Sequence, residues 1–247
     1  MTLYKFTNLT NAVKERDSPL RQYLNQRFPN ARQLQTEYRT RCGNLIVDSG
    51  GANAGTLGAA FDFQVRFVLD PSVRPTVAIL AFGGRPEYST AIEGIMHRAA
   101  GSAREVDDEV LARACWALAL CAEVYRVGGI TPGSPLGPLL VAGNFTTEAL
   151  LALAPDDAVR QLRELEAIAA ESLLPHLEKP LTLGPTFDAS RLCSADADLI
   201  AGGCSWTSRL IWEQRTRGPV FAPTGCHLSI CTRSWHTHSS ITPIPIR

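Results

Sequence analysis

The sequence predicts an α/β protein in which a mostly helical N-terminal part leads into a small, incomplete sheet and then an irregular C-terminal tail. Apolar residues recur at helical spacing over two long segments, 106–127 and 155–173. The segment 198–200 reads Asp-Leu-Ile and has the pattern of a short strand that begins at a carboxylate. Beyond residue 203 the composition changes abruptly. The chain therefore combines helices, a small sheet and an unlike tail.

Length and composition indicate a globular protein. The 247 residues suffice for one full domain with a core, and 45% hydrophobic with 19% charged residues is an ordinary composition. No apolar run reaches the roughly 18 residues that a membrane span needs, and residues 1–17 lack the features of a signal peptide. Seven cysteines without compact spacing argue against a secreted disulfide framework. We therefore expect a cytoplasmic protein with no membrane partner.

Start and stop signals predict four helices. Proline and acidic residues favour a first turn, whereas glycine and a following proline favour an end. These signals place helices after Ser18, over 57–70 before Pro71, over 106–127 before Gly128, and from Pro155 up to Pro175. The short apolar stretch 77–82, which ends at two glycines, predicts a strand or a buried turn.

A net charge of zero conceals a break after Gly203. The segment 204–247 contains one acidic residue, Glu213, against five arginines, which leaves 19 basic and 23 acidic residues in 1–203. The same segment holds three of the four tryptophans and three of the seven cysteines, and it has no lysine or aspartate. The sequence therefore divides into a helix-rich domain, 1–203, and a tail, 204–247, which is either a separate module or the product of a different reading frame.

The segment that carries candidate chemistry is FDASRLCSADADLIAGG, residues 187–203. A carboxylate at Asp198 would project from a backbone held by the aliphatic residues that follow it. Magnesium prefers hard oxygen ligands and is usually held by one or two carboxylates. Two interpretations remain open on the residues alone: Asp196 and Asp198 begin a hairpin, or Asp198 is a metal ligand.

ADADLI before a glycine turn resembles the second motif of the PD-(D/E)XK nucleases, in particular their RecB-type domains. The resemblance extends over residues 45–203 and includes GAAFDFQVRF and ACWALALCAEVYRVG. It implies a restriction-endonuclease-like core, magnesium as the cofactor, DNA as the partner, and hydrolysis of phosphodiesters. It also implies that Asp198 is a catalytic metal ligand and that Asp62 is the acid such domains carry on an early helix, with Glu123 as a further candidate.

The sequence departs from this family after Gly203. The family continues with two hydrophobic residues, Asp or Glu, any residue and Lys, whereas this chain reads CSWTSR over 204–209. Read from the third base of the Cys204 codon, the same DNA permits two hydrophobic residues, a forced aspartate, an aliphatic residue and lysine. The aspartate does not depend on which synonymous codons are used. The last base of the Trp206 codon is G and the first two bases of the Thr207 codon are AC, and together they form the aspartate codon GAC. We therefore expect the front part of a nuclease domain, a frame-shifted tail, and no activity.

An alternative is a non-enzymatic helical interaction protein with a zinc-binding tail. Cys226, Cys231, His236 and His238 supply the ligand types of a structural zinc site. Their spacing is unusual, because paired cysteines in such sites lie two to four residues apart and histidines three to five apart. The other interpretation of residues 214–247 is an unfolded extension.

Overall fold

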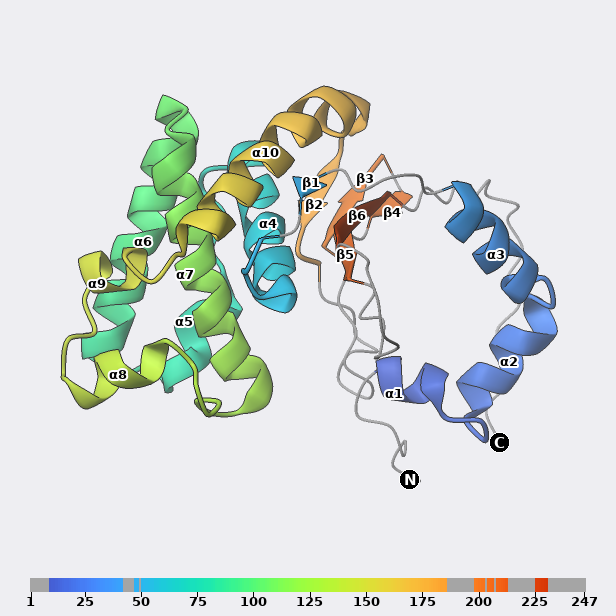
Figure 1. The fold of residues 1–247 in the computed structure, drawn as a ribbon, viewed down its shortest axis with the longest axis horizontal. Coiled ribbons are helices and arrows are strands. Elements are labelled where there is room, and N and C mark those ends of the chain that lie inside the picture. Colours follow the sequence, from blue (N-terminus) through green and yellow to red (C-terminus); the bar gives the residue numbers. More distant parts are fainter. Residues whose placement is uncertain are drawn as a thin grey trace, which may run out of the picture.

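A computed structural model describes residues 9–41, 47–48, 50–185, 198–202, 204–206, 208–212 and 225–230, and this part of the chain is mostly helical (Figure 1). The α-helices are α1 Leu9–Lys14, α2 Pro19–Arg27, α3 Ala31–Arg41, α4 Ala54–Leu69, α5 Thr76–Ile79, α6 Pro86–Glu105, α7 Asp108–Val127, α8 Leu136–Val141, α9 Thr147–Leu151 and α10 Asp156–Ser172. Two 3-10 turns, η1 Leu80–Phe82 and η2 Leu174–His176, follow α5 and α10.

Helix α7 forms the centre of the helical body. It begins at Asp107, whose carboxylate accepts a hydrogen bond from the Val110 N–H at 3.2 Å, and it ends at Gly128 with a φ of 78°. Twelve of its 20 residues are buried, so it is enclosed on most of its circumference. Many of these are alanines, which let α4, α5, α6 and α10 approach closely. The core of the protein lies around this helix.

Helix α4 packs against α7 and carries the largest buried side chains. The Asn53 side chain caps its N-terminus by accepting the Thr56 N–H at 3.0 Å. Phe61 and Phe67 are fully buried. The helix ends at Leu69, because Pro71 follows shortly and cannot continue it.

The strands form two small antiparallel sheets. They are β1 Val47–Asp48, β2 Leu181–Leu183, β3 Leu199–Ala201, β4 Cys204–Trp206, β5 Ser208–Trp212 and β6 Gly225–Ile230. One sheet has the order β2-β3-β4 and the other β1-β6-β5. In Figure 1 the strands lie beside α4, between the helical body and an arc formed by α1, α2 and α3.

The four helices expected from start and stop signals are confirmed as α2, α4, α7 and α10. Helix α6 has no counterpart among those predictions, although Pro86 at its first turn and buried Ile92, Ile95 and Ala99 are helical signals. None of the helices in the described part of the chain is long and apolar enough to cross a membrane.

Two expectations differ from the structure. The stretch 77–82 is neither a strand nor a plain turn but continues α5 into η1, because Ala78 packs in the core and Gly83, with a φ of 65°, ends the turn. The tail was expected to be irregular, yet its described residues form β4, β5 and β6. Ile and Trp, which occur in these strands, favour strand conformation, and antiparallel partners supply the backbone hydrogen bonds there.

The packing of α4 on α7 predicts a large effect of core truncation. Phe61→Ala should lower the free energy of unfolding by about 3–5 kcal/mol, because it opens a cavity in the helical core around α4. Val141→Ala, at a side chain that is 92% exposed, should change it by less than about 0.5 kcal/mol. Urea denaturation of both variants measures the difference; equal effects would contradict this packing.

Candidate functional site

Asp62 and Arg66 lie one turn apart on α4 and form a bidentate ion pair. Arg66 Nε donates to Asp62 Oδ1 at 3.0 Å, and Arg66 Nη2 lies 2.5 Å from Asp62 Oδ2. A spacing of four residues places both side chains on the same face of the helix. Two parallel contacts between a guanidinium and a carboxylate fix the orientation of both groups.

Asp198 approaches the same guanidinium from the sheet. Its Oδ1 lies 4.0 Å from Arg66 Nη2. The backbone of Asp198 is held at the start of β3, where its carbonyl accepts the Gly184 N–H at 2.8 Å next to the Leu183–Leu199 pair. The two aspartates predicted as metal ligands, which are far apart in the sequence, therefore meet at one arginine.

Gly184 provides the space for this arginine. Its φ of 57° lies in the left-handed region that favours glycine. A Cβ built at this position would overlap Arg66 Nη1. The turn after β2 thus requires glycine for two reasons, its backbone conformation and the guanidinium packed against it.

Burial raises the pKa of Asp62 from 3.8 to about 7. Loss of solvent is the largest cause; the Arg66 charge acts in the opposite direction, and the Asp198 charge raises the pKa further. The Asp62 side chain is 12% exposed and that of Asp198 is 28% exposed. The site is therefore enclosed on the helix side, at Asp62, and more open to solvent on the strand side, at Asp198. The raised pKa means that Asp62 changes its charge near neutral pH.

The donor atoms suit a hard divalent cation, but the set is small. Carboxylate oxygens are the ligands that magnesium takes, commonly one or two of them with water and substrate phosphate. In the described residues no group of three or more His, Cys, Asp or Glu side chains is arranged to hold a metal. Glu123 lies elsewhere on α7, where it accepts a hydrogen bond from Thr131 Oγ1 at 3.4 Å. The structure brings together two of the three candidate acids.

Several predicted positions lie outside the description. Asp196, Cys231, His236 and His238 are not among the described residues, and Cys226 is described only as backbone within β6. Arg66 was not among the predicted site residues. Its spacing of four from Asp62 on an expected helix is the signal that could have indicated an ion pair.

A buried polar group lies behind Asp62 in the helical body. Gln64 Nε2 donates to Glu166 Oε2, while Gln64 Oε1 is buried without a hydrogen-bond partner. Burial raises the pKa of Glu166, and it also raises that of the Cys115 thiol well above 9.0, with added effects of the Glu166 and Asp62 charges. A thiol in this state is protonated at neutral pH, so Cys115 is a core residue and not a nucleophile.

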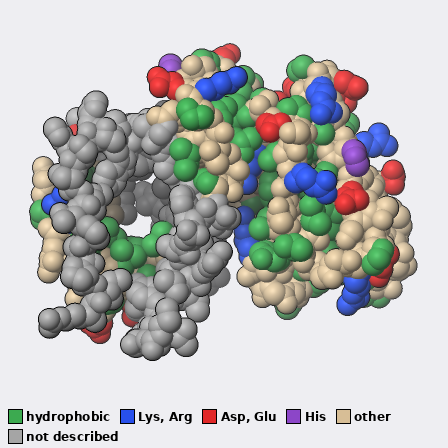
Figure 2. Space-filling model, turned by 180° about the vertical axis from the view of Figure 1, so that it is seen from behind, with side chains coloured by type: hydrophobic (Ala, Val, Ile, Leu, Met, Phe, Trp, Pro, Cys, Tyr) green, Lys and Arg blue, Asp and Glu red, His purple; other side chains and the backbone are tan. Residues whose placement is uncertain are grey.

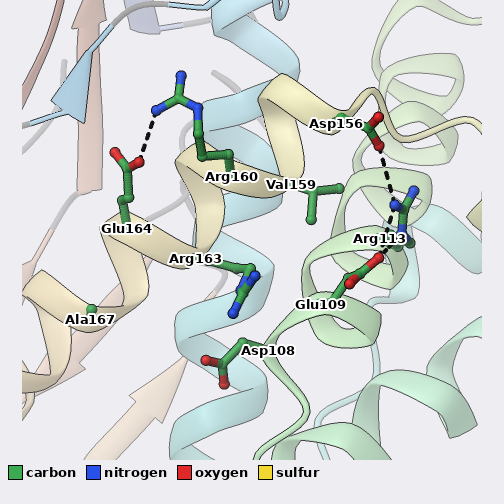
Figure 3. Close-up of a pocket in the computed structure, with 9 residues that line it drawn as sticks. All are labelled: Asp108, Glu109, Arg113, Asp156, Val159, Arg160, Arg163, Glu164 and Ala167. Atoms are coloured by element: carbon green, nitrogen blue, oxygen red, sulfur yellow. Dashed lines mark hydrogen bonds and ion pairs between the residues drawn. The ribbon is translucent and has the colours of Figure 1, made fainter.

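A separate pocket of about 530 Å³ lies between α7 and α10 (Figure 3). Arg113 connects its two walls: it contacts Glu109 Oε1 at 3.0 Å and Asp156 Oδ1 at 3.3 Å. Arg160 and Glu164, on the α10 side, form a further pair at 2.8 Å. Of these pairs, the one between Arg113 and Asp156 crosses from α7 to α10, which favours a structural role in joining the two helices.

Figure 2, which views the molecule from behind relative to Figure 1, shows acidic and basic side chains interspersed over the described surface of the helical body. This matches the balance of 24 basic and 24 acidic residues in the chain.

Comparison with protein-family models, with curated proteins and with solved structures returns no match. The assignment of a function therefore depends on the geometry around Asp62 and Asp198.

The raised pKa of Asp62 predicts a pH-dependent stability. Because the folded pKa of about 7 exceeds the unfolded value of 3.8, the protonated Asp62 carboxyl favours the folded state. Its contribution to the free energy of unfolding is complete below about pH 4 and is lost as the pH rises through 7. Between about pH 5 and pH 8, wild type should lose roughly 3 kcal/mol relative to Asp62→Asn, whose amide does not titrate. Urea denaturation across this range measures the difference.

Asp70→Asn is the control for this experiment. Hydrogen bonds from the Ser72 hydroxyl and N–H lower the pKa of Asp70, so it is ionised in both states throughout the range. Its stability difference from wild type should stay constant. A constant difference for Asp62→Asn as well would show that Asp62 does not titrate as its burial requires.

Proposed function

We propose that residues 1–203 form the front part of a nuclease-like domain of the PD-(D/E)XK type with a restriction-endonuclease-like core, and that this chain lacks the cleavage activity. The observation that carries the proposal is the approach of Asp62, on an early helix, and Asp198, at the start of a strand, to one point. In the family that the sequence resembles, acids from these two kinds of element belong to one metal site.

The β3–β4 hairpin supports the proposed origin of the tail. Leu199 pairs with Trp206, and residues opposed in this way point to the same face of an antiparallel sheet. The aspartate codon of the shifted frame spans the end of codon 206 and the start of codon 207. The acid that it encodes would therefore lie across the hairpin from the segment 198–199. In the chain as written, β4 reads Cys-Ser-Trp and contributes neither acid nor lysine.

The chemistry proposed for the complete domain is hydrolysis of a DNA phosphodiester. A magnesium ion at Asp62 and Asp198 would supply Lewis-acid polarisation and a water of lowered pKa. In this chain the two carboxylates supply oxygen ligands for such an ion, but β4 as encoded brings neither the second acid nor the lysine. The cytoplasm remains the proposed compartment; the free, buried thiols of Cys115 and Cys121 are consistent with it.

The proposal predicts that the purified full chain does not cleave DNA. With Mg²⁺ or Mn²⁺ and linear duplex or single-stranded substrates, its rate should equal that of the Asp198→Ala variant, because the second strand acid and the lysine are absent. Gel analysis of labelled DNA measures both rates. Magnesium-dependent turnover that disappears with Asp198→Ala would overturn the proposed inactivity.

A frame-restored chain gives the complementary experiment. Its segment 204–247 is replaced by the translation of the same coding DNA read from the third base of codon 204. We expect this chain to gain metal-dependent cleavage, which Asp198→Ala abolishes because removal of a metal ligand commonly costs several orders of magnitude in rate. A stop codon shortly after the shift, or an inert frame-restored chain, would count against the proposed function. Stoichiometric zinc in the unaltered chain would instead favour the interaction protein with a zinc-binding tail.

A further inference from the structure

We infer that the Arg66 guanidinium acts as an internal cation between Asp62 and Asp198, and that it excludes divalent metal ions from this carboxylate pair. The inference deepens the proposed function and rests on its assignment of the two aspartates to one cation site. It assigns to Arg66 a regulatory role in the chain as encoded: where these two carboxylates are the only acids of the site, the arginine must leave before a metal can bind.

The geometry supports the inference first through a shared atom. Nη2 of Arg66 lies 2.5 Å from Asp62 Oδ2 and 4.0 Å from Asp198 Oδ1. Because both distances are measured from this nitrogen, Asp62 Oδ2 and Asp198 Oδ1 lie at most 6.5 Å apart. A magnesium ion requires oxygens at about 2.1 Å, so the two oxygens must lie within about 4.2 Å of each other to share one ion. Asp198, whose side chain is 28% exposed, is the less enclosed of the two groups that would have to adjust. The positive charge already at this point is the guanidinium.

The guanidinium is also fixed in place. Its bidentate pairing with Asp62 orients the planar group, and Gly184 adjoins Nη1 on another side. The Arg66 side chain is 19% exposed, so water screens the interaction only in part. An arginine stays charged at all physiological pH values, which makes it a permanent competitor for an external cation.

Electrostatics connects removal of the arginine to metal affinity. Two carboxylates, one of them buried, repel each other and lose solvation when no cation is near. Arg66 offsets this repulsion in the chain as it stands. Without the guanidinium, a divalent cation from solution would offset the repulsion between the two carboxylates in its place. The affinity of the site for such a cation should therefore rise on the order of 100-fold.

Titration with Mn²⁺, followed by electron paramagnetic resonance at mildly alkaline pH, tests the inference on the full chain. We expect no saturable binding to wild type at millimolar concentration, binding on the order of 100-fold tighter to Arg66→Gln, and loss of that binding when Asp198→Asn is added. Arg160→Gln is the matched control, because it removes the same charge from an arginine paired with Glu164 on a half-exposed face. It should bind like wild type.

Gly184→Ala provides a second route if Arg66→Gln does not fold. The added Cβ would displace the guanidinium and leave every charge in the chain unchanged. This variant should also gain Mn²⁺ binding that depends on Asp198. Circular dichroism shows whether each variant is folded.

Two results would overturn the inference: wild type that binds Mn²⁺ as tightly as Arg66→Gln, or folded Arg66→Gln and Gly184→Ala that bind no better than Arg160→Gln. The frame-restored chain separates this failure from that of the proposed function. Cleavage by that chain together with no gain in Arg66→Gln rejects the inference alone. A gain in Arg66→Gln together with a frame-restored chain that stays inert, with or without Arg66→Gln, rejects the nuclease proposal alone.

Discussion

The packing of α4 on α7 is the constraint on which the candidate site depends. Fully buried Phe61 and Phe67 hold α4 in one rotation about its axis, because turning the helix would expose an aromatic ring and bury a charge. In that rotation Asp62 and Arg66 lie where the β2–β3 strands pass the helix. The position of the charged groups is thus a consequence of where the aromatic groups are buried.

The polar side of α4 shows how a folded chain holds a carboxylate in an unfavourable place. Asp62 is buried beside a second carboxylate, and both effects raise its pKa. Arg66 stabilises its charged form through two parallel contacts, but burial has the larger effect. Stability and metal binding are therefore opposed at this site. The Arg66 guanidinium, which stabilises the two carboxylates in the folded chain, is also the group that an incoming metal ion would have to displace.

The two candidate acids could be identified singly from the sequence, but their relation could not. Asp198 was suggested by a local pattern, a carboxylate before two aliphatics and a glycine turn, and Asp62 by its place on an early helix in a family resemblance. Nothing in the sequence placed them near one another, or indicated that Arg66 lies between them and that Gly184 leaves room for it. These are contacts through space between a helix and a strand, and helical or strand periodicity contains no information about them.

The sequence by itself determined the features that are set within a few residues. Gly128 and Pro71 marked helix ends correctly, because caps and chain breakers act on the neighbouring backbone. The tertiary structure alone decided that 77–82 is helical and that tail residues form strands, because these depend on burial against α7 and on pairing with distant segments. It also decided the protonation of Asp62, since desolvation arises only when the whole body has closed around that carboxylate.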